Sequence, residues 1–303
     1  MAKSAAVLGE FDLFSAVGIP WVARAAAEIS RVGRRFAVVG LSSLALSACR
    51  FEDAFIFYPT TVIERTPADA GLDFSDVYFH TRDGVRLNGW FVPHAEARST
   101  LIWFHGNAGN ISHRVDNLKR LHDHAKLNIF LFDYRGYGRS QGRAFEDGTY
   151  LDGEAALAYV RDHLAIETGT MVLFGRSLGA AVAAETATRF EIQALILESP
   201  FTSIREMARA AFPLLPLGAL LQTRYDILEK IPRINAPLLV LHGDRDEIVP
   251  FAQGKAVFDA APQPKTFYRI AGAGHNDTYL IGGEAYFREL KNFIESTAPP
   301  ARE

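Results

Sequence analysis

Five short apolar runs constrain the fold of this chain more than any other feature of its sequence. They are LIWF at 101–104, IFLF at 129–132, MVLF at 171–174, ALIL at 194–197 and LLVL at 238–241, and a less uniform sixth run, TFYRI, covers 266–270. A strand formed by such a run is apolar on both faces and needs helices on each side. The runs therefore predict a parallel sheet between two layers of helices.

Spacing outside these runs predicts the helices and a hairpin. Apolar residues recur at helix spacing within 111–121, 156–164 and 286–293. Segment 76–93 contains two β-rich stretches around Asp83-Gly84, which is a strong hairpin signal. We therefore predict an α/β fold with a mostly parallel central sheet, antiparallel at its N-terminal edge. Ligands of such sheets bind where the strands end, so the residues after each run are site candidates.

The composition argues against a nucleic-acid or metal partner. Of the 303 residues, 49% are hydrophobic and 22% charged, and the net charge is −3, with no basic stripe and no P-loop motif. His122 and His124 lie two apart on a predicted helix, so they face different directions and make a poor metal pair. His105 and His242 each precede a glycine at a strand end, and we interpret them as hydrogen-bonded loop supports. We expect no cofactor.

The motif glycine-any-serine-any-glycine occurs twice, at 138–142 and at 175–179. A nucleophile elbow requires a strand that runs directly into the first glycine, a sharp turn at the serine, and an immediate helix. Ser177 meets these conditions, because MVLF abuts Gly175 and small residues follow the motif. Ser140 does not, because its strand ends several residues earlier and a loop continues after it. We predict Ser177 as the nucleophile and Ser140 as a loop residue.

A serine nucleophile needs a histidine to take its proton and a carboxylate to orient that histidine. The loop at 242–250, HGDRDEIVP, follows the LLVL run and contains two aspartates, Asp244 and Asp246. The loop at 271–277, AGAGHND, follows the last predicted strand and contains His275. Along the chain the order is therefore serine, acid, histidine.

Six motifs together resemble those of the α/β-hydrolase superfamily over residues 76–294. They are HGNAGN at 105–110, DYRGYG at 133–138, GRSLG at 175–179, ESPF at 198–201, HGDRDEIVP at 242–250 and GH at 274–275. The chain is most similar to the small serine hydrolases related to serine aminopeptidases, acylglycerol lipases and protein depalmitoylases. This resemblance implies an α/β-hydrolase fold and a serine hydrolase.

The resemblance also implies roles for single residues. Asp246 would be the acid and His275 the base, with Asp244 as the alternative acid. The oxyanion of a tetrahedral intermediate needs preorganised donors. One is the backbone N–H of Leu178, directly after the nucleophile, and the other, by resemblance, is the backbone N–H of Asn107. The alternative for Asn107 is a tight turn without a catalytic part.

The expected reaction is hydrolysis of a carboxylic ester or thioester in a small-molecule acyl substrate. Serine at the nucleophile position, by resemblance, excludes dehalogenase and epoxide-hydrolase chemistry. Peptide or amide cleavage of the serine aminopeptidase type is one alternative, and a non-catalytic binding module is another. An apolar insert at about 203–234 occupies the place of a short lid, or else forms a plain packing helix. It is too short for a large cap, which favours an open site.

The N-terminal segment predicts attachment to a membrane. Arg34 and Arg35 precede an apolar run at 36–48, which has the length of a signal-peptide core and is shorter than a membrane span. The run ends in LSAC at 46–49, which resembles the bacterial lipobox, and this implies acylation of Cys49. The alternative is an uncleaved anchor.

About thirty residues precede this run, more than a signal peptide normally has. Either translation starts near Val32, or the preceding residues form an extra membrane-surface helix. We therefore expect a targeting segment at 1–49 and a hydrolase domain at 50–303. The expected location is the bacterial cell envelope, where lipid-linked substrates are favoured. A cytoplasmic or inner-membrane-anchored protein is the alternative.

Overall fold

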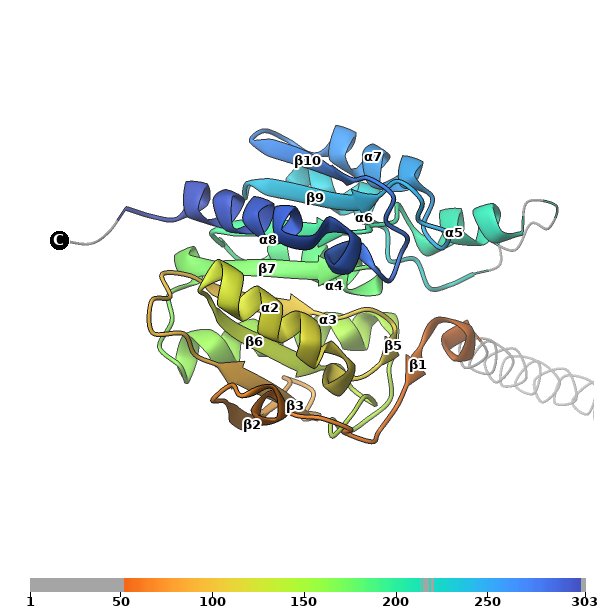
Figure 1. Ribbon diagram of the computed structural model, residues 1–303. Coiled ribbons are helices and arrows are strands. Elements are labelled where there is room, and N and C mark those ends of the chain that lie inside the picture. The colour runs from red at the N-terminus through yellow and green to blue at the C-terminus, as the bar shows by residue number, and fades with distance from the viewer. Residues whose placement is uncertain (1–51, 213, 215–217, 219–220, 301–303) are drawn as a thin grey trace, which may run out of the picture. The chain divides into compact units, whose positions relative to one another are not determined.

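An eight-stranded sheet organises the computed structural model, which describes residues 52–300 apart from 213, 215–217 and 219–220. Its strand order is β10-β9-β8-β7-β4-β6-β3-β2 (Figure 1). The strands are β2 (Ser75–His80), β3 (Arg86–Val92), β4 (Thr100–Phe104), β6 (Asn128–Asp133), β7 (Met171–Arg176), β8 (Ala194–Glu198), β9 (Leu238–Gly243) and β10 (Lys265–Ile270). Each of the six apolar runs lies in one of them, as predicted.

Strand direction also agrees with the prediction. The strands from β10 to β6 pair in parallel, whereas β3 pairs antiparallel with both β6 and β2. The hairpin between β2 and β3 turns at Gly84, whose φ of 84° lies in the left-handed region that glycine adopts without strain. A separate two-stranded sheet pairs β1 (Tyr58–Pro59) with β5 (Ala108–Gly109).

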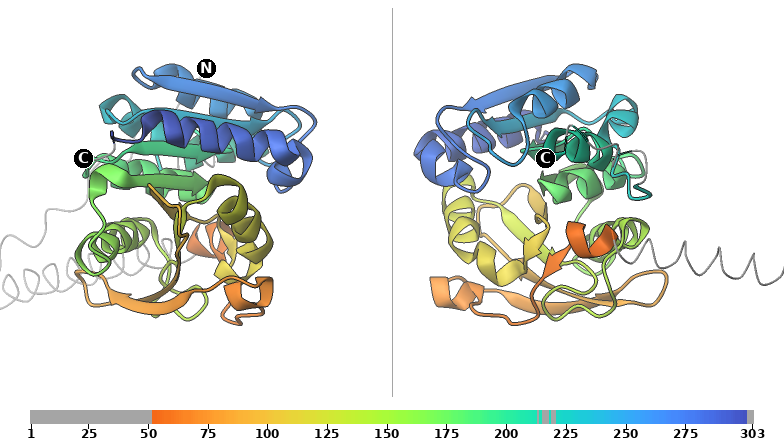
Figure 2. Two further views of the ribbon diagram at one scale, coloured as in Figure 1. Left: turned by 60° about the vertical axis from the view of Figure 1, so that its left-hand side comes forward. Right: turned by 90° about the vertical axis from the view of Figure 1, so that its right-hand side faces the viewer.

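Helices cover both faces of the large sheet. They are η1 (Pro67–Ala70), η2 (Ile111–Arg114), α2 (Val115–Ala125), α3 (Glu146–Asp162), η3 (Thr168–Thr170), α4 (Leu178–Ala187), α5 (Ile204–Ala211), α6 (Ile227–Lys230), η5 (Ile231–Arg233), α7 (Phe251–Ala260) and α8 (Thr278–Thr297). Helices α2 and α8 cover one face, and α3, α4, α6 and α7 cover the other (Figure 2).

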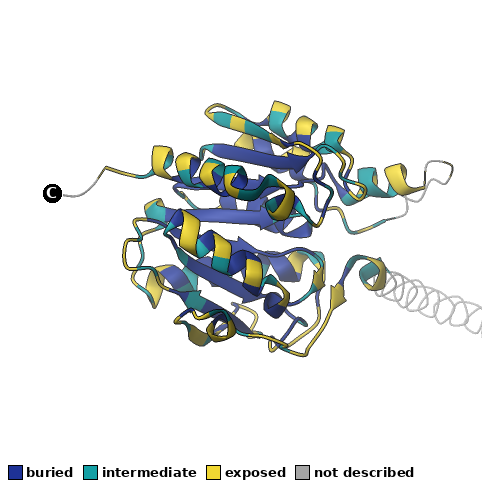
Figure 3. Cartoon of the chain, in the orientation of Figure 1, coloured by how far each residue is buried: buried dark blue, intermediate teal, exposed yellow. Residues whose placement is uncertain are grey.

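The central strands are buried on both faces (Figure 3). Successive residues of β4 alternate between two apolar clusters, because side chains of a strand point to opposite faces in turn. Leu101 and Trp103 belong to the cluster under α2 and α8, and Ile102 and Phe104 to the cluster under α3 and α4. This double burial explains why the strands are continuous apolar runs instead of alternating patterns.

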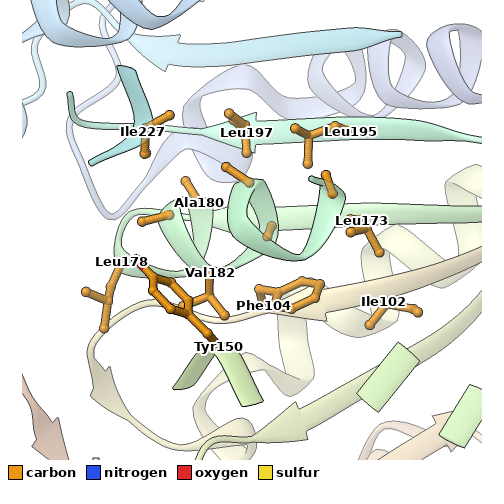
Figure 4. Close-up of a cluster of buried hydrophobic side chains, with 14 of the residues drawn as sticks. Ile102, Phe104, Tyr150, Leu173, Leu178, Ala180, Val182, Leu195, Leu197 and Ile227 are labelled. Carbon is orange, nitrogen blue, oxygen red and sulfur yellow. The ribbon is translucent and has the colours of Figure 1, made fainter. Parts of the chain in front are cut away.

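Helix α4 packs against the centre of the sheet. Leu178, Ala180 and Val182 on this helix lie among Phe104 of β4 and Leu173 of β7 (Figure 4). The helix is built mainly from alanines that are fully buried. Small side chains let a helix approach a sheet closely, and the start of this helix is therefore held firmly at the carboxyl end of β7.

The segment predicted as a lid divides into two parts. Its last part is core, because Tyr225, Ile227 and Ile231 are buried and Ile227 packs with α4. Its first part contains α5, after which Phe212 and Leu214 are exposed by 52% and 94%. Because β8 neighbours β7 in the sheet, this apolar segment leaves the sheet beside the end of β7.

The buried Arg135 connects the β2–β3 turn to α3. Its hydrogen bonds lead us to predict that the stability of the fold depends on pH. Arg135 Nε donates to Asp152 at 2.8 Å, and its two terminal nitrogens donate to Asp83 at 2.9 and 3.1 Å. The hydrogen bonds from Arg135 lower the pKa of Asp83 from 3.8 to about 2. Since the folded pKa is the lower one, this pair stabilises the fold above pH 4 and loses its contribution as the pH falls toward 2.

We predict that Asp83→Asn lowers the free energy of unfolding at pH 7 by about 1 kcal/mol, a value reduced for solvent screening because the side chain is 39% exposed. Urea unfolding should be measured from pH 7 to pH 2. The difference in the free energy of unfolding between Asp83→Asn and wild type should decrease below pH 4. The exposed Asp73→Asn is the control for loss of a charge. A difference that stays constant down to pH 2 would contradict the assignment.

Candidate active site

Ser177 occupies a strained turn between a strand and a helix. Strand β7 ends at Arg176 and α4 begins at Leu178, so the serine is the only residue between them. Its φ of 52° and ψ of −118° are rare for a residue with a side chain, and such strain is typical of functional sites. Its N–H donates to the carbonyl of Glu198 at 2.9 Å. The predicted strand-turn-helix geometry at this serine is therefore present.

The two glycines of this motif are required by close approach of the main chain. A Cβ atom on Gly175 would lie 2.5 Å from the carbonyl oxygen of Gly179, and one on Gly179 would lie 2.0 Å from the carbonyl oxygen of Phe104. Real Cβ atoms do not approach other atoms so closely. Both positions must therefore lack a side chain for the helix to begin here.

Ser140, in the second copy of the motif, has a structural role. Its hydroxyl donates to the carbonyl of Asp133 at 2.7 Å and accepts from the N–H of Asn88 at 2.9 Å. The residue is buried and links the end of β6 to β3. It is a loop residue, as predicted, and both hydrogen-bonding partners of its hydroxyl are main-chain groups.

The acid and the base of the predicted site lie in contact. His275 Nδ1 is 2.8 Å from Asp246 Oδ2. Asp244, the alternative acid, accepts instead from Arg269 at 2.9 Å and from the N–H of Gly272 at 2.7 Å. The geometry therefore selects Asp246 as the partner of His275.

The side chain of Asp246 is buried, and several hydrogen-bond donors surround its carboxylate. Its Oδ1 accepts from the N–H of Ile248 at 2.9 Å and of Val249 at 2.7 Å, and His242 Nε2 lies 3.3 Å from its Oδ2. Burial alone would raise the pKa of Asp246, but the hydrogen bonds from His242 and His275, with the N–H of Val249, hold that pKa far below its usual value. The carboxylate is therefore charged at neutral pH.

His242 contacts the side chain of Asp246 and the loop that carries it, which its position in the sequence alone does not show. Its Nε2 lies 3.1 Å from the carbonyl of Val249 as well as near Asp246. His105 directly follows β4. Its Nδ1 lies 2.7 Å from the carbonyl oxygen of Gly106, and its Nε2 lies 3.3 Å from Oδ1 of the buried Asp133. Both are hydrogen-bonded loop supports, as predicted. The sequence carries no periodic signal for the contact between His242 and Asp246, because residues 242–246 run from the end of β9 into a turn.

The loop after β4 lies against the serine. A Cβ atom on Gly106 would lie 3.7 Å from Cβ of Ser177. The carbonyl of the next residue, Asn107, accepts from the N–H of Tyr58 at 3.0 Å and from the hydroxyl of Tyr137 at 2.7 Å. The side-chain amide of Asn107 donates to the carbonyl of Ile56 at 2.9 Å. These bonds fix the position of the loop. The backbone N–H of Asn107 has no hydrogen-bond partner among the described residues and is therefore free to donate.

A second donor lies at the beginning of α4. The N–H of Leu178 belongs to the first turn of this helix, where N–H groups have no partner within the helix and carry partial positive charge. Helix N-termini of this kind suit negatively charged oxygen atoms. A carbonyl oxygen attacked by Ser177 would develop its charge near this group.

The predicted site residues thus lie after the carboxyl ends of four strands of the sheet. Ser177 follows β7, Asp246 follows β9, His275 follows β10 and Asn107 follows β4. This arrangement provides a serine hydroxyl, an oriented imidazole and main-chain N–H donors, which are the components of acyl transfer.

Cys49 and the predicted targeting segment at 1–49 lie outside the described residues. Within the part of the chain that is described, none of the helices has the length and apolar character needed to cross a membrane.

Comparison with known proteins relates this geometry to a family. The sequence profile of the serine aminopeptidase family S33 matches residues 95–220 and 216–278. An uncharacterised protein of Mycobacterium tuberculosis is 39% identical over 225 residues, which are 74% of this chain and 80% of that protein. The α/β hydrolase domain-containing protein 17B of Homo sapiens is 34% identical over 215 residues, 71% of this chain and 73% of that protein.

Solved structures agree with the fold. An esterase of Pyrococcus furiosus superposes with a TM-score of 0.67 at 22% sequence identity, covering 80% of this chain and 97% of its own. An α/β hydrolase of Vibrio vulnificus superposes with a TM-score of 0.61 at 17% identity, covering 75% of this chain and 82% of its own. These likenesses confirm the α/β-hydrolase fold.

The close approach at Gly179 predicts a large effect of one methyl group. Gly179→Ala should destabilise the protein by about 3 kcal/mol, because the added Cβ meets main chain that cannot move aside cheaply. Thermal unfolding should show a Tm lower by roughly 6–10 °C. Gly169→Ala is the matched control, since a Cβ there meets nothing within 4 Å. Equal melting temperatures for the two variants would contradict the close packing of α4 against the end of β4.

Proposed function

This chain belongs to the serine aminopeptidase family S33 of the α/β hydrolases, and we propose that it cleaves a carboxylic ester or thioester through an acyl-enzyme on Ser177. One observation carries the proposal: the hydrogen bond of 2.8 Å between His275 and Asp246, at the edge of the sheet where Ser177 occupies a strained turn. An imidazole oriented in this way can accept the proton of a serine hydroxyl.

In the proposed reaction, Ser177 Oγ attacks the carbonyl carbon of the substrate while His275 Nε2 takes its proton. The buried carboxylate of Asp246 stabilises the resulting imidazolium through Nδ1. The electron pair of the broken π bond moves to the carbonyl oxygen, which accepts hydrogen bonds from the N–H groups of Leu178 and Asn107. The tetrahedral intermediate collapses, and the imidazolium protonates the departing alkoxide or thiolate. Water then repeats these steps on the acyl-enzyme and releases the acid.

The surroundings of the serine support a small or protruding acyl substrate. Ser177 is partly exposed, and α5, the helix that follows β8, has only 8 residues. Phe212 and Leu214 expose apolar surface after this helix and could contact an acyl chain. The Pyrococcus furiosus neighbour is an esterase, which favours an ester. The name of the S33 family favours amide cleavage as the second candidate.

We predict that Ser177→Ala lowers kcat for short-chain nitrophenyl esters by at least about 1,000-fold, since no nucleophile remains. Ser140→Ala is the matched control and should retain most of the wild-type kcat per folded molecule. It should cost about 1–3 kcal/mol of stability, because the N–H of Asn88 loses a buried partner.

A fluorophosphonate probe, followed by mass spectrometry, separates enzyme from binding module. Labelling of Ser177 in the wild-type protein is expected, and folded wild-type protein that remains unlabelled would favour a binding module. Equal loss of activity in both serine variants would overturn the assignment of the nucleophile. Parallel assays with esters, thioesters and aminoacyl nitroanilides of increasing acyl length would identify the bond cleaved.

We further propose that the chain is held at a bacterial membrane by an acyl group on Cys49, as its sequence resemblance to a lipobox implies. Intact-mass analysis of the protein purified from its native membrane should show a chain that begins at an acylated Cys49. Cys49→Ala should move the protein to the soluble fraction, whereas the control Ser177→Ala should stay with the membrane. A mature protein that retains residues before Cys49 would contradict cleavage at this site.

A further inference from the structure

A buried carboxylate beside the site is not used in the proposed reaction. Glu198, the last residue of β8, is fully buried. Its Oε1 accepts from Arg176 Nε at 3.0 Å and from Thr278 Oγ1 at 2.7 Å, and its Oε2 accepts from the hydroxyl of Tyr286. Its main-chain carbonyl accepts the N–H of Ser177 at 2.9 Å. One residue therefore contacts the main chain of the predicted nucleophile and side chains of α8.

Arg176 connects this carboxylate to the predicted base. It directly precedes Ser177, and its Nε faces Glu198. Its Nη2 donates to the carbonyl of His275 at 2.5 Å and to Asn276 Oδ1 at 3.0 Å. The guanidinium thus holds Glu198 at one edge and the His275 peptide at another, although His275 lies 99 residues away in the sequence.

The charges make this connection rigid. A buried carboxylate is costly unless it is paired and fully hydrogen-bonded, and Arg176 supplies the paired charge with a side chain only 12% exposed. Burial raises the pKa of Tyr286 well above 10, so its hydroxyl is a neutral donor to Glu198 at neutral pH. The planar guanidinium presents donors at fixed angles, so the position of Glu198 determines where the His275 carbonyl is held.

The other hydrogen bonds of His275 to described residues connect it to the loop after β9 and not to β7. Asp246 holds the ring of His275, and Glu247 accepts its main-chain N–H at 3.1 Å. Both acids belong to the loop after β9. Arg176 is the contact that joins the histidine to β7, the strand that carries the serine.

We propose that Arg176 and Glu198 form a positioning pair that sets the distance between the imidazole of His275 and the hydroxyl of Ser177. This inference rests on the proposed function. Neither side chain touches the reacting atoms; the pair acts through the peptide of His275. A displacement of a catalytic group by about 1 Å can cost roughly 100-fold in rate, so loss of the link should lower kcat while substrate binding changes little.

Arg176→Lys is the variant that tests the link, because lysine keeps the positive charge near Glu198 but cannot bond both partners in the fixed geometry of a guanidinium. We expect kcat for a nitrophenyl ester to fall about 10- to 100-fold with KM changed less than about threefold. The rate constant of fluorophosphonate labelling should fall in parallel. Arg189→Lys is the matched control, since Arg189 pairs with Glu185 at the far end of α4, and it should keep the wild-type kcat.

Glu198→Gln provides a second test should the lysine variant fold poorly. Glutamine keeps the shape of the side chain and removes the charge that orients Arg176, so kcat should again fall. Because both residues act through one link, the kcat of the double variant should be little lower than the kcat of the less active single variant. All rates are referred to folded protein, measured by near-ultraviolet circular dichroism.

The outcomes separate the two proposals. Full kcat in folded Arg176→Lys or Glu198→Gln, with Ser177→Ala inactive, would overturn the positioning role and leave the proposed function intact. A lower melting temperature with unchanged kcat would likewise overturn it, because it would mark a purely structural pair. Wild-type activity in Ser177→Ala would overturn the proposed function itself.

Discussion

The rest of the site depends on the close packing of α4 against the central strands. Gly175 lets this helix lie close to β7, and Gly179 lets it lie close to the main chain at the end of β4. Once the helix begins directly after the strand, the residue between them must turn sharply, and Ser177 takes a backbone conformation that costs energy. The buried alanines of α4 offset this cost through dense packing. The strained serine is thus a consequence of a tight core.

The carboxylates at the site are buried, and each is stabilised by hydrogen-bond donors or by an opposite charge, because an unpaired buried charge is costly. Asp246 receives two main-chain N–H groups and two imidazole nitrogens. Glu198 receives an arginine and two hydroxyl groups. The donors to Glu198 come from β7 and α8, and those to Asp246 come from the end of β9 and from the loops after β9 and β10. Hydrogen bonding of the two carboxylates therefore also fixes these elements relative to one another. Preorganisation of the site and stability of the fold therefore have the same source.

The N-terminal part of the described chain contributes to the site in a way the sequence did not suggest. Residues 52–56 are helical, and β1 begins two residues later, at Tyr58. The carbonyl of Ile56 and the N–H of Tyr58 bond to the side chain and carbonyl of Asn107. Glu52 accepts from the N–H groups of Gln222 and Thr223 in the segment after α5. This short stretch therefore links the loop after β4 to the insert after β8.

The sequence by itself determined the strands, the hairpin and the serine that sits in an elbow, because those features follow from local periodicity and from the steric needs of glycine. It also placed an acid and a histidine in loops that must meet at one edge of a parallel sheet. Only the tertiary structure decided that Asp246 and not Asp244 faces His275, that His242 supports the carboxylate, and that Arg176 reaches the histidine peptide. These contacts join residues from separate strands, and their geometry depends on strand order and on loop paths that packing of the whole domain sets.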